Sequence, residues 1–338
     1  MNQNLEPGTR NLERPSLMWL HRYAKFVSAA TVLLIVAGGL VTSTGSGLAV
    51  PDWPTSYGWN MFTFPMKHMV GGIFYEHGHR LIASGVGFLT IVLAFWIWRV
   101  ECRRWMRILG LTALGSVCLQ GALGGITVLY FLPTAVSTAH AGLAQIFFCM
   151  TVSIALFTSR GWIAPNHEPV DDRLLRLVAT ATTAFIYLQI IIGATMRHSD
   201  AGLAIPDFPL VFGGIVPPTW TPQIAIHFAH RVGALLVTLA IAATVGHVWF
   251  HHAQRSELRR PALALACLVL TQVTLGAFVI WSEKNVAINT AHVVVGALTL
   301  ASSLVLTLRS HQVRFGHAAA RTVGIHTPPL ATSAEARA

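Results

Sequence analysis

The sequence predicts an all-α polytopic membrane protein in which eight transmembrane helices form two pseudo-symmetric four-helix bundles. Three observations predict this class: the composition, the number of long apolar stretches and an internal repeat. Of the 338 residues, 54% are apolar and only 11% are charged, whereas about one quarter of an average soluble domain is charged. So little charge cannot cover a water-soluble protein of this size, which excludes an ordinary cytosolic enzyme, a disordered chain and a disulfide scaffold.

Eight stretches are apolar enough to form a membrane-spanning helix, which takes roughly 20 residues. They cover residues 26–44, 78–98, 108–130, 138–159, 174–195, 228–250, 262–281 and 289–308. The first stretch is too long for the apolar core of a typical signal peptide. It also has a counterpart in the second half of the chain, so we interpret it as a span.

The internal repeat divides the spans into two sets of four. The matching pairs are residues 47–54 and 202–209, 79–80 and 230–231, 120–124 and 272–276, and 138–140 and 290–292. Each repeat has an even number of spans, so both enter the membrane from the same side, which predicts a parallel repeat. The expected organisation is a tail, a first bundle, a linker, a second bundle and a second tail, at residues 1–20, 21–160, 161–173, 174–309 and 310–338.

Basic residues predict the orientation. Of the 23 Lys and Arg residues, 18 lie in the two tails and in the loops after the second, fourth and sixth spans. Because such loops stay in the cytoplasm, both termini are predicted to be cytoplasmic. The net charge of +10 is therefore a topology signal scattered over loops, and it does not form the basic face that nucleic-acid binding needs.

Four histidines occupy equivalent places in the repeat. They are expected in about the first turn of the second, fourth, sixth and eighth spans, at His79, His140, His230 and His292. In each bundle two of them would lie at the same depth on parallel helices, which suits the two axial ligands of one heme iron. A lone histidine at a helix end is usually only hydrogen-bonded, but four at equivalent positions favour heme ligation near the outer face.

Other metals fit these pairs less well. Tetrahedral zinc takes three or four protein ligands close together, and a di-iron bundle needs several inward glutamates. We expect the remaining histidines at cytoplasmic edges and in tails to be solvated: His21, His167, His247, His251, His252, His311, His317 and His326. His68 and His198 lie in outer loops and are left unassigned.

Glu76 breaks the symmetry of the repeat, because its counterpart in the second half is His227. Glu76 shares a helical face with His79, three residues on, which makes it the candidate catalytic acid or base. The alternative is that it only complements the positive end of its helix. His77 is a second candidate for handling protons, and His227 is either a supporting group or an alternative ligand to His230.

The remaining motif residues have two interpretations each. Arg80 and Arg231 follow the histidines and either pair with heme propionates or reach to the membrane interface. Hydrogen bonding between helices is the expected task of Gln120, Gln272, Thr138 and Thr290, and Gly124 and Gly276 are expected to allow close packing or to make room for a porphyrin. The proline-stiffened loops at 47–54 and 202–209 are candidate lids, in which Asp52 and Asp207 cap a turn or contact a propionate through water.

Together these motifs resemble the heme A synthase family, over about residues 20–310. The resemblance rests on residues 45–54, Glu-x-x-His-Arg at 76–80, Thr-Ala-His at 138–140 and 290–292, and His-Arg at 230–231. The resemblance implies oxidation of the C8 methyl group of heme O to the formyl group of heme A. It implies that His79 and His140 flank the substrate heme O, that His230 and His292 ligate a resident heme b, and that Glu76 is the functional glutamate.

The resemblance also implies that the protein lies in the bacterial inner membrane. The implied partners are heme O, an electron acceptor of unknown identity and, by pathway logic, a heme O synthase. A homo-oligomer is left open. Many relatives carry cysteine pairs in the outer loops, but this chain has Val50, Ser56, Ile205 and Val211 around the two motifs, and its four cysteines lie elsewhere. A thiol relay is therefore in doubt here.

Two rival functions use the same histidines. A diheme b-type electron carrier would keep both hemes bound and would need no unique Glu76. A parallel-repeat transporter would relay protons through histidines, but its polar residues would lie near the bilayer midplane, whereas here they gather at the outer ends of the spans.

Overall fold

The structure, a computed structural model, describes residues 15–165, 168 and 170–313, and this part of the chain is helical with two isolated bridges in its loops. Eight helices are long and apolar enough to cross a membrane. They are α2 (Pro15–Ser43), α3 (Gly72–Val100), α4 (Arg104–Leu129), α5 (Thr134–Phe157), α7 (Arg173–His198), α8 (Pro222–His251), α9 (Ser256–Trp281) and α10 (Val286–Ser310). The all-α class and the eight spans are thus confirmed. Three short helices are α6 (Arg160–Ile163), η1 (Met66–His68) and η2 (Ala201–Leu203).

Most spans begin earlier than hydropathy predicts. For example, α8 begins at Pro222 rather than near residue 228, because Thr221 caps it by accepting the amide of Ile224 and Pro222 suits a first helical turn. Hydropathy marks the apolar middle of a helix, but the backbone ladder continues through polar residues to the cap. The four repeat-related histidines consequently lie about two turns inside their helices, and their expected place in the first turn is wrong.

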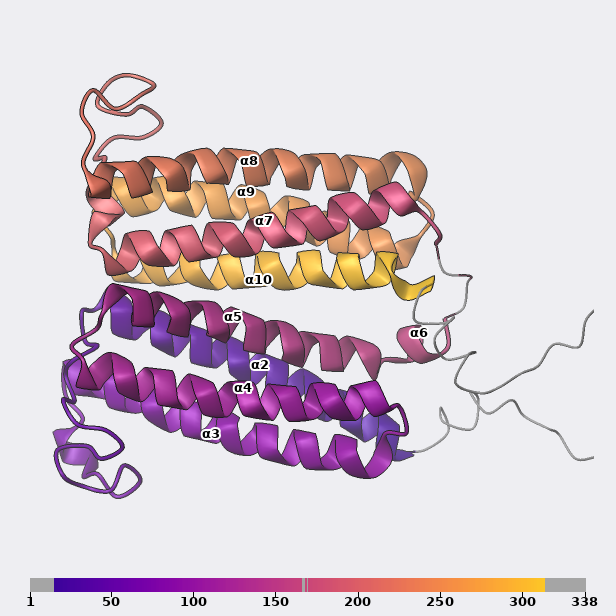
Figure 1. Ribbon diagram of the computed structural model, residues 1–338, viewed down its shortest axis with the longest axis horizontal. Helices are drawn as coiled ribbons and strands as arrows, with labels where there is room; N and C mark the ends of the chain where they lie inside the picture. The colour runs from indigo at the N-terminus through magenta and orange to yellow at the C-terminus, as the bar shows by residue number, and fades with distance from the viewer. Residues whose placement is uncertain (1–14, 166–167, 169, 314–338) are drawn as a thin grey trace, which may run out of the picture.

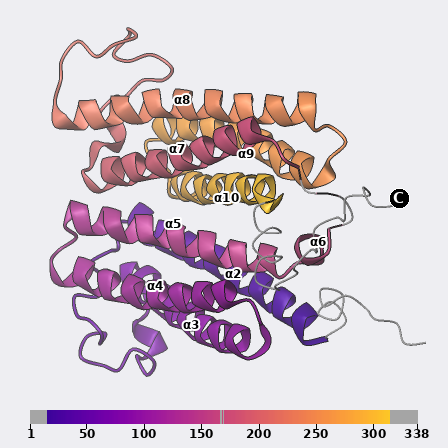
Figure 2. The ribbon, with the colours of Figure 1, turned by 45° about the vertical axis from the view of Figure 1, so that its right-hand side comes forward.

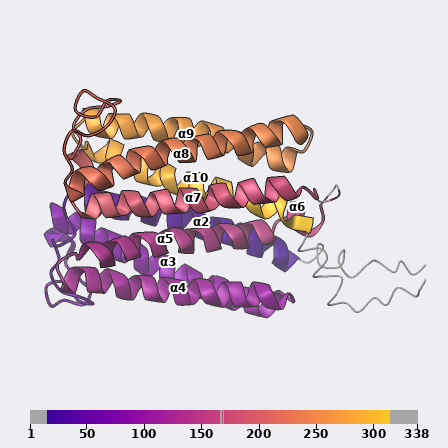
Figure 3. The ribbon, with the colours of Figure 1, turned by 45° about the horizontal axis from the view of Figure 1, so that its top comes forward.

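The eight helices form two groups of four (Figure 1). In the first group α2, α3, α4 and α5 each pack against two others of the group, and α7 to α10 do the same in the second. The groups meet where α2 packs on α10 and where α5 packs on α7 and α10, and the turned views show the same two layers (Figures 2 and 3). The predicted domain boundaries and the symmetry axis stay predictions.

Each group has its own apolar core, and a third cluster joins them. Leu93, Ile97, Met106, Phe147 and Ile154 are among the buried residues of the first core, and Leu175, Ile241, Leu258, Leu265 and Leu300 of the second. Between the groups, Ile35 and Phe148 pack with Ala297 and Ala301. Large apolar side chains such as Phe88 and Leu270 remain exposed on the outside of the helices, as expected where lipid is the solvent.

The molecule has two unlike ends. We call one the loop end, because it carries residues 44–71 and 199–221, and the other the α6 end; they lie at the left and the right of Figure 1. Sequence predicts that the loop end faces outward, and this orientation stays a prediction. Residues 1–14 and 314–338, and with them most of the predicted tails, lie outside the described residues, as do His167, His317 and His326.

Three of the histidines that we expected to be solvated hydrogen-bond to residues distant in the chain, at the α6 end. His21 donates through Nδ1 to the carbonyl of Ala155 at 2.9 Å. His247 and His252 both hydrogen-bond through Nε2 to Oδ2 of Asp172, at 2.7 and 2.8 Å. Burial alone would raise the pKa of the Asp172 carboxyl, but hydrogen bonds from His247, from a backbone amide and from His252 hold this pKa well below its usual range. The expectation failed because these partners are distant in sequence.

Candidate functional site

The four repeat-related histidines face one another in two pairs near the loop end. His79 on α3 and His140 on α5 come from helices that lie diagonally across the first group, and they are close enough to interact electrostatically. His230 on α8 and His292 on α10 are placed in the same way in the second group, with ring centroids 6.5 Å apart. Each pair therefore projects into the middle of its own bundle.

The spacing of the second pair fits two histidines on opposite sides of a heme iron. Imidazole–metal bonds of about 2 Å on opposite sides of an ion put the ring centres roughly 6 Å apart, close to the 6.5 Å between His230 and His292. Buried Nδ1 atoms of His79, His140 and His292 have no hydrogen-bond partner within the described part of the chain. Two imidazoles on separate helices suit a metal already held by a porphyrin, because such a metal needs no further protein ligand.

A glycine on the neighbouring helix lies against each of the four histidine rings. The pairs are Gly38 and His79, Gly124 and His140, Gly193 and His230, and Gly276 and His292. A Cβ atom added to these glycines would come within 3.1, 3.2, 2.8 and 3.3 Å of the imidazole Cε1. The close packing expected of Gly124 and Gly276 is thus confirmed. Gly38 and Gly193 were missed, although they are 155 residues apart, as are Gly47 and Gly202.

Gln189 makes the second pair unlike the first. Its amide Nε2 donates to the carbonyl oxygen of His230 at 2.7 Å and to Nδ1 of the same residue at 3.0 Å. The residue 155 positions earlier is Leu34, which has no group to offer His79. His230 is therefore fixed by a side chain on α7, and His79 is not. Sequence reasoning missed Gln189 because it has no repeat partner.

The predicted contacts between helices are present for some of the motif residues. Gln120 donates to the carbonyl of His140 at 2.9 Å, and Thr290 bonds to Ser43 on α2 at 3.0 Å, so both links are confirmed. Thr138, by contrast, has a buried hydroxyl without a partner within the described residues. Gln272 lies 3.4 Å from Nε2 of His292, a contact that metal ligation through this nitrogen would replace.

Glu76 is buried and holds a loop. Its Oε2 accepts the amide of Val50 at 2.8 Å, and its Oε1 accepts from Arg80 at 2.7 Å. The residue is 4% exposed, so its charge lies away from water and is balanced by one guanidinium. The carboxylate therefore joins α3 to the first loop (residues 47–59).

His227 has the corresponding place in the second group. Its Nδ1 accepts the amide of Ile205 at 3.2 Å, and Ile205 stands where Val50 stands in the first loop. Glu76 and His227 thus share the anchoring of a loop, and they differ in the negative charge that only Glu76 brings. His77, the second candidate for proton handling, bonds to Ser56 at 3.0 Å and is also buried.

Arg80 and Arg231 clamp the two loops. Arg80 donates to the carbonyls of Val50, Asp52 and Thr55 at 2.7 to 3.0 Å. Arg231 donates in the same way to residues 205, 207 and 210 of the second loop (residues 202–214). These bonds occupy both terminal nitrogens of each guanidinium group, so contact with a propionate stays a prediction that would require other N–H groups or a rearranged loop.

Asp52 and Asp207 cap turns, as the favoured interpretation predicted. Asp52 accepts the amides of Tyr57 and Gly58, and Asp207 accepts those of Phe212 and Gly213. Partial burial alone would raise the pKa of Asp52, but these amides and the Thr55 hydroxyl lower it. The Gly213 amide is the main cause of the lowered pKa of Asp207. The two loops therefore have the same turn.

Arg197 links the two groups beside the second pair of histidines. Its guanidinium donates to the carbonyl of Gly39 at 3.1 Å and to the hydroxyl of Ser43 at 2.7 Å, both on α2. It is also near enough to His292 to interact with it electrostatically. Sequence reasoning counted Arg197 only as a basic residue of the outer side, because the first half has Thr42 at the corresponding position.

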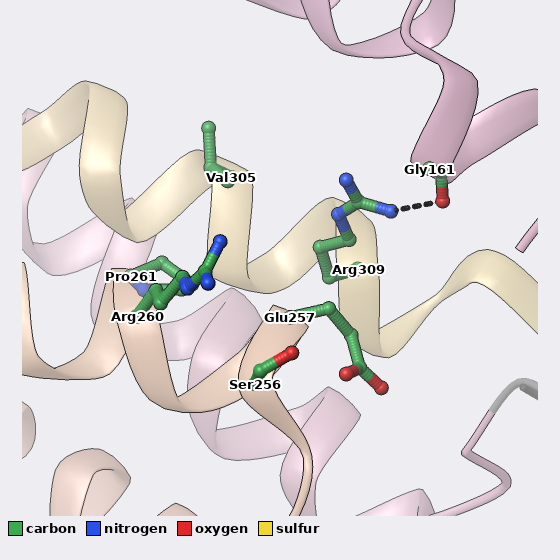
Figure 4. A pocket seen from close by; sticks show the side chains of 7 residues that line it. All are labelled: Gly161, Ser256, Glu257, Arg260, Pro261, Val305 and Arg309. Atoms are coloured by element: carbon green, nitrogen blue, oxygen red, sulfur yellow. Dashed lines mark hydrogen bonds between the residues drawn. The ribbon is translucent and has the colours of Figure 1, made fainter. Parts of the chain in front are cut away.

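A cavity of about 610 Å³ lies at the α6 end, away from the histidine pairs (Figure 4). It is lined by Gly161, Ser256, Glu257, Arg260, Pro261, Val305 and Arg309. Arg309 donates to the carbonyl of Gly161 at 2.7 Å across it. Because none of the predicted ligands lines this cavity, it is not the site that the histidines form.

Replacing Arg80 by Gln should loosen the first loop, because three carbonyls and one carboxylate lose their charged donor. A net loss of about 2 kcal/mol, within the range for hydrogen bonds to charged groups, would speed amide exchange in residues 47–59 by roughly thirtyfold. Hydrogen–deuterium exchange measures this directly. Arg231→Gln is the matched control and should loosen residues 202–214 instead; unchanged exchange in the first loop would contradict the clamp.

Comparison with known proteins places this arrangement in a family. The family model described as cytochrome oxidase assembly protein, COX15-CtaA, matches residues 21–304. The Heme A synthase of Geobacillus kaustophilus is 26% identical over 281 residues, 82% of this chain and 86% of that protein. The Heme A synthase of Symbiobacterium thermophilum is 29% identical over 262 residues (74% and 82%), and that of Rhizobium etli is 27% identical over 319 residues (80% and 83%). The chain thus belongs to the COX15-CtaA family of cytochrome oxidase assembly proteins.

Proposed function

We propose that the chain is a heme A synthase that oxidises the C8 methyl group of heme O to the formyl group of heme A. The observation that carries the proposal is the difference between two otherwise similar histidine sites: the first has a buried carboxylate, Glu76, where the second has His227. An enzyme with one reactive site and one permanent site needs such a difference. The relatives named Heme A synthase support the same assignment.

The two sites have separate tasks in this proposal. His79 and His140 bind the substrate heme O, and His230 and His292 hold a resident heme b. Support for this division comes from Gln189, which donates to the backbone carbonyl of His230 and has no counterpart at His79. A fixed ligand suits a group that stays bound, and a freer one suits a substrate that must leave as product. Heme b, when bound, supplies a one-electron carrier next to the substrate site.

Glu76 and the first loop act on the substrate methyl group. The loop limits the access of bulk water to the site. Each of two successive hydroxylations replaces one hydrogen of the methyl carbon by a hydroxyl group from a water molecule, with two electrons passing to the acceptor and two protons released, one of which Glu76 accepts. Loss of water from the resulting geminal diol leaves the formyl group. Arg80 orients the carboxylate through its bond to Oε1, and the Val50 amide holds Oε2. The electron acceptor lies outside what the chain's own residues identify.

The proposed setting is the bacterial inner membrane, with the loop end outward and both termini in the cytoplasm. Eight spans of membrane length support a multi-pass protein, and the bias of basic residues toward the α6 end supports the orientation. A heme O synthase is the proposed supplier of substrate.

Pigment analysis of the purified protein, expressed with a heme O supply, tests the function. Hemes B, O and A should be extracted together. His292→Ala should lower heme B by roughly tenfold or more, the scale for losing a metal-site group. His140→Ala should keep heme B and lose heme A. Heme B alone in both sites would favour the rival diheme electron carrier, and a preparation without heme would overturn heme binding altogether.

A further inference from the structure

A cluster of three metal-ligating side chains lies at the α6 end, far from the histidine pairs. His247, His252 and Asp172 each offer one possible ligand atom, and these three atoms lie within 4.8 Å of one another. His247 is in the last turns of α8, His252 is the residue that ends that helix, and Asp172 caps the start of α7. We propose that these three residues bind a divalent transition-metal ion of the zinc class, which ties the start of α7 to the end of α8.

The donor set is the first argument for the site. Two imidazole nitrogens and one carboxylate oxygen are ligands that zinc and related ions prefer, and a water molecule in the fourth position completes a tetrahedral site with three protein ligands. The side chains of His247, His252 and Asp172 are 13%, 14% and 20% exposed. They are therefore partly withdrawn from water but within reach of an ion.

The geometry requires little movement. His247 and His252 hydrogen-bond to the same oxygen, Oδ2 of Asp172, at 2.7 and 2.8 Å. Ligand atoms of a tetrahedral zinc ion lie about 3.4 Å apart for bonds of about 2.1 Å, so each contact must open by roughly 0.6 Å. The other oxygen of Asp172 accepts the Leu175 amide at 2.9 Å, which aims Oδ2 at the two histidines.

The surroundings leave room for a cation. The partial negative charge at the end of α8 lies next to His252 and offsets the partial positive charge at the start of α7 next to Asp172. Two nearby arginines already pair with carboxylates, Arg176 with Asp171 and Arg255 with Glu257. A cavity of about 450 Å³, lined in part by His251 and His252, lies beside the cluster and gives a fourth ligand, such as water, access to the ion.

Zinc binding to the full-length, tag-free protein in detergent tests the proposal. After treatment with EDTA, equilibrium dialysis against Zn²⁺ with metal quantification should give one tight equivalent per chain. Asp172→Asn and His252→Ala should each weaken it by at least tenfold. The Asp172→Asn variant keeps an acceptor for the Leu175 amide, since Asn caps helices as well as Asp does. His251→Ala is the matched control and should leave the affinity unchanged.

A second measurement needs no variant. X-ray absorption at the zinc edge of the loaded wild-type protein should show two imidazole ligands with the remaining ligands oxygen. Sulfur ligation would overturn the proposal, as would equal zinc binding by wild type and by the Asp172→Asn, His252→Ala double variant. The site is independent of heme, so its failure would leave the proposed function standing.

Discussion

Replacing Glu76 by Gln is expected to abolish conversion of heme O to heme A while the resident heme b stays bound. Gln offers an oxygen to the Val50 amide, so the bond from α3 to the first loop survives. What is lost is the negative charge and the ability to accept a proton. Loss of a general base lowers rates by roughly 10² to 10⁴, which extraction and separation of hemes from expressing cells would register as an absence of heme A.

The choice of Gln over Ala matters, because Ala would also leave the Val50 amide and the Arg80 guanidinium without their acceptor. A loss of activity in Glu76→Ala would therefore not separate chemistry from loop anchoring. His227→Gln is the matched control: it keeps an acceptor for Ile205 and should retain activity. Full conversion by Glu76→Gln would show that this residue only anchors the loop.

Replacing Gly193 by Ala is expected to displace His230 and to lower the heme b content of the second site. The added Cβ would lie 2.8 Å from Cε1 of the imidazole, a distance at which the ring must move. Overpacking of this kind costs about 1 to 3 kcal/mol, which is roughly a 5- to 150-fold loss of affinity. The heme b content of purified protein, measured by absorption spectroscopy per chain, reports the change.

Gly246→Ala is the control for this substitution. Gly246 lies in α8 of the same group, and an added Cβ would meet nothing within 4 Å, so the variant should keep its heme and gain the stability that Ala brings to a helix. Gly38→Ala should instead disturb His79 and lower heme A formation without loss of heme b. Retention of heme b by Gly193→Ala would show that the ring can shift without leaving its site.

Much of this fold could be predicted from the composition and the internal repeat, because membrane-spanning helices are long and uniformly apolar. Eight spans and the four histidines could be found from the sequence, since apolar length and repeated motifs are local signals. The ends of the helices could not, because a cap such as Thr221 starts its helix several residues before the stretch that hydropathy identifies.

The contacts that set the properties of the site join residues distant in the sequence, and most of them could not be predicted from it. Glu76 was singled out from its lack of a repeat partner, but its bonds to Val50 and Arg80 depend on how the first loop folds back. His247 and His252 seemed ordinary edge residues until the fold brought Asp172 beside them. Only Gly38 and Gly193 could have been found earlier, by extending the repeat to their spacing.

The clamped first loop has a kinetic consequence for any large molecule that reaches the His79 and His140 pair. A heme that entered through the loop end would first have to break the bonds of Arg80 to the loop and the bond of Glu76 to Val50. A heme that slid in sideways from the lipid, between helices, would break none of them. In the proposed function, the lateral route would let heme O enter and heme A leave while the first loop stays closed over Glu76.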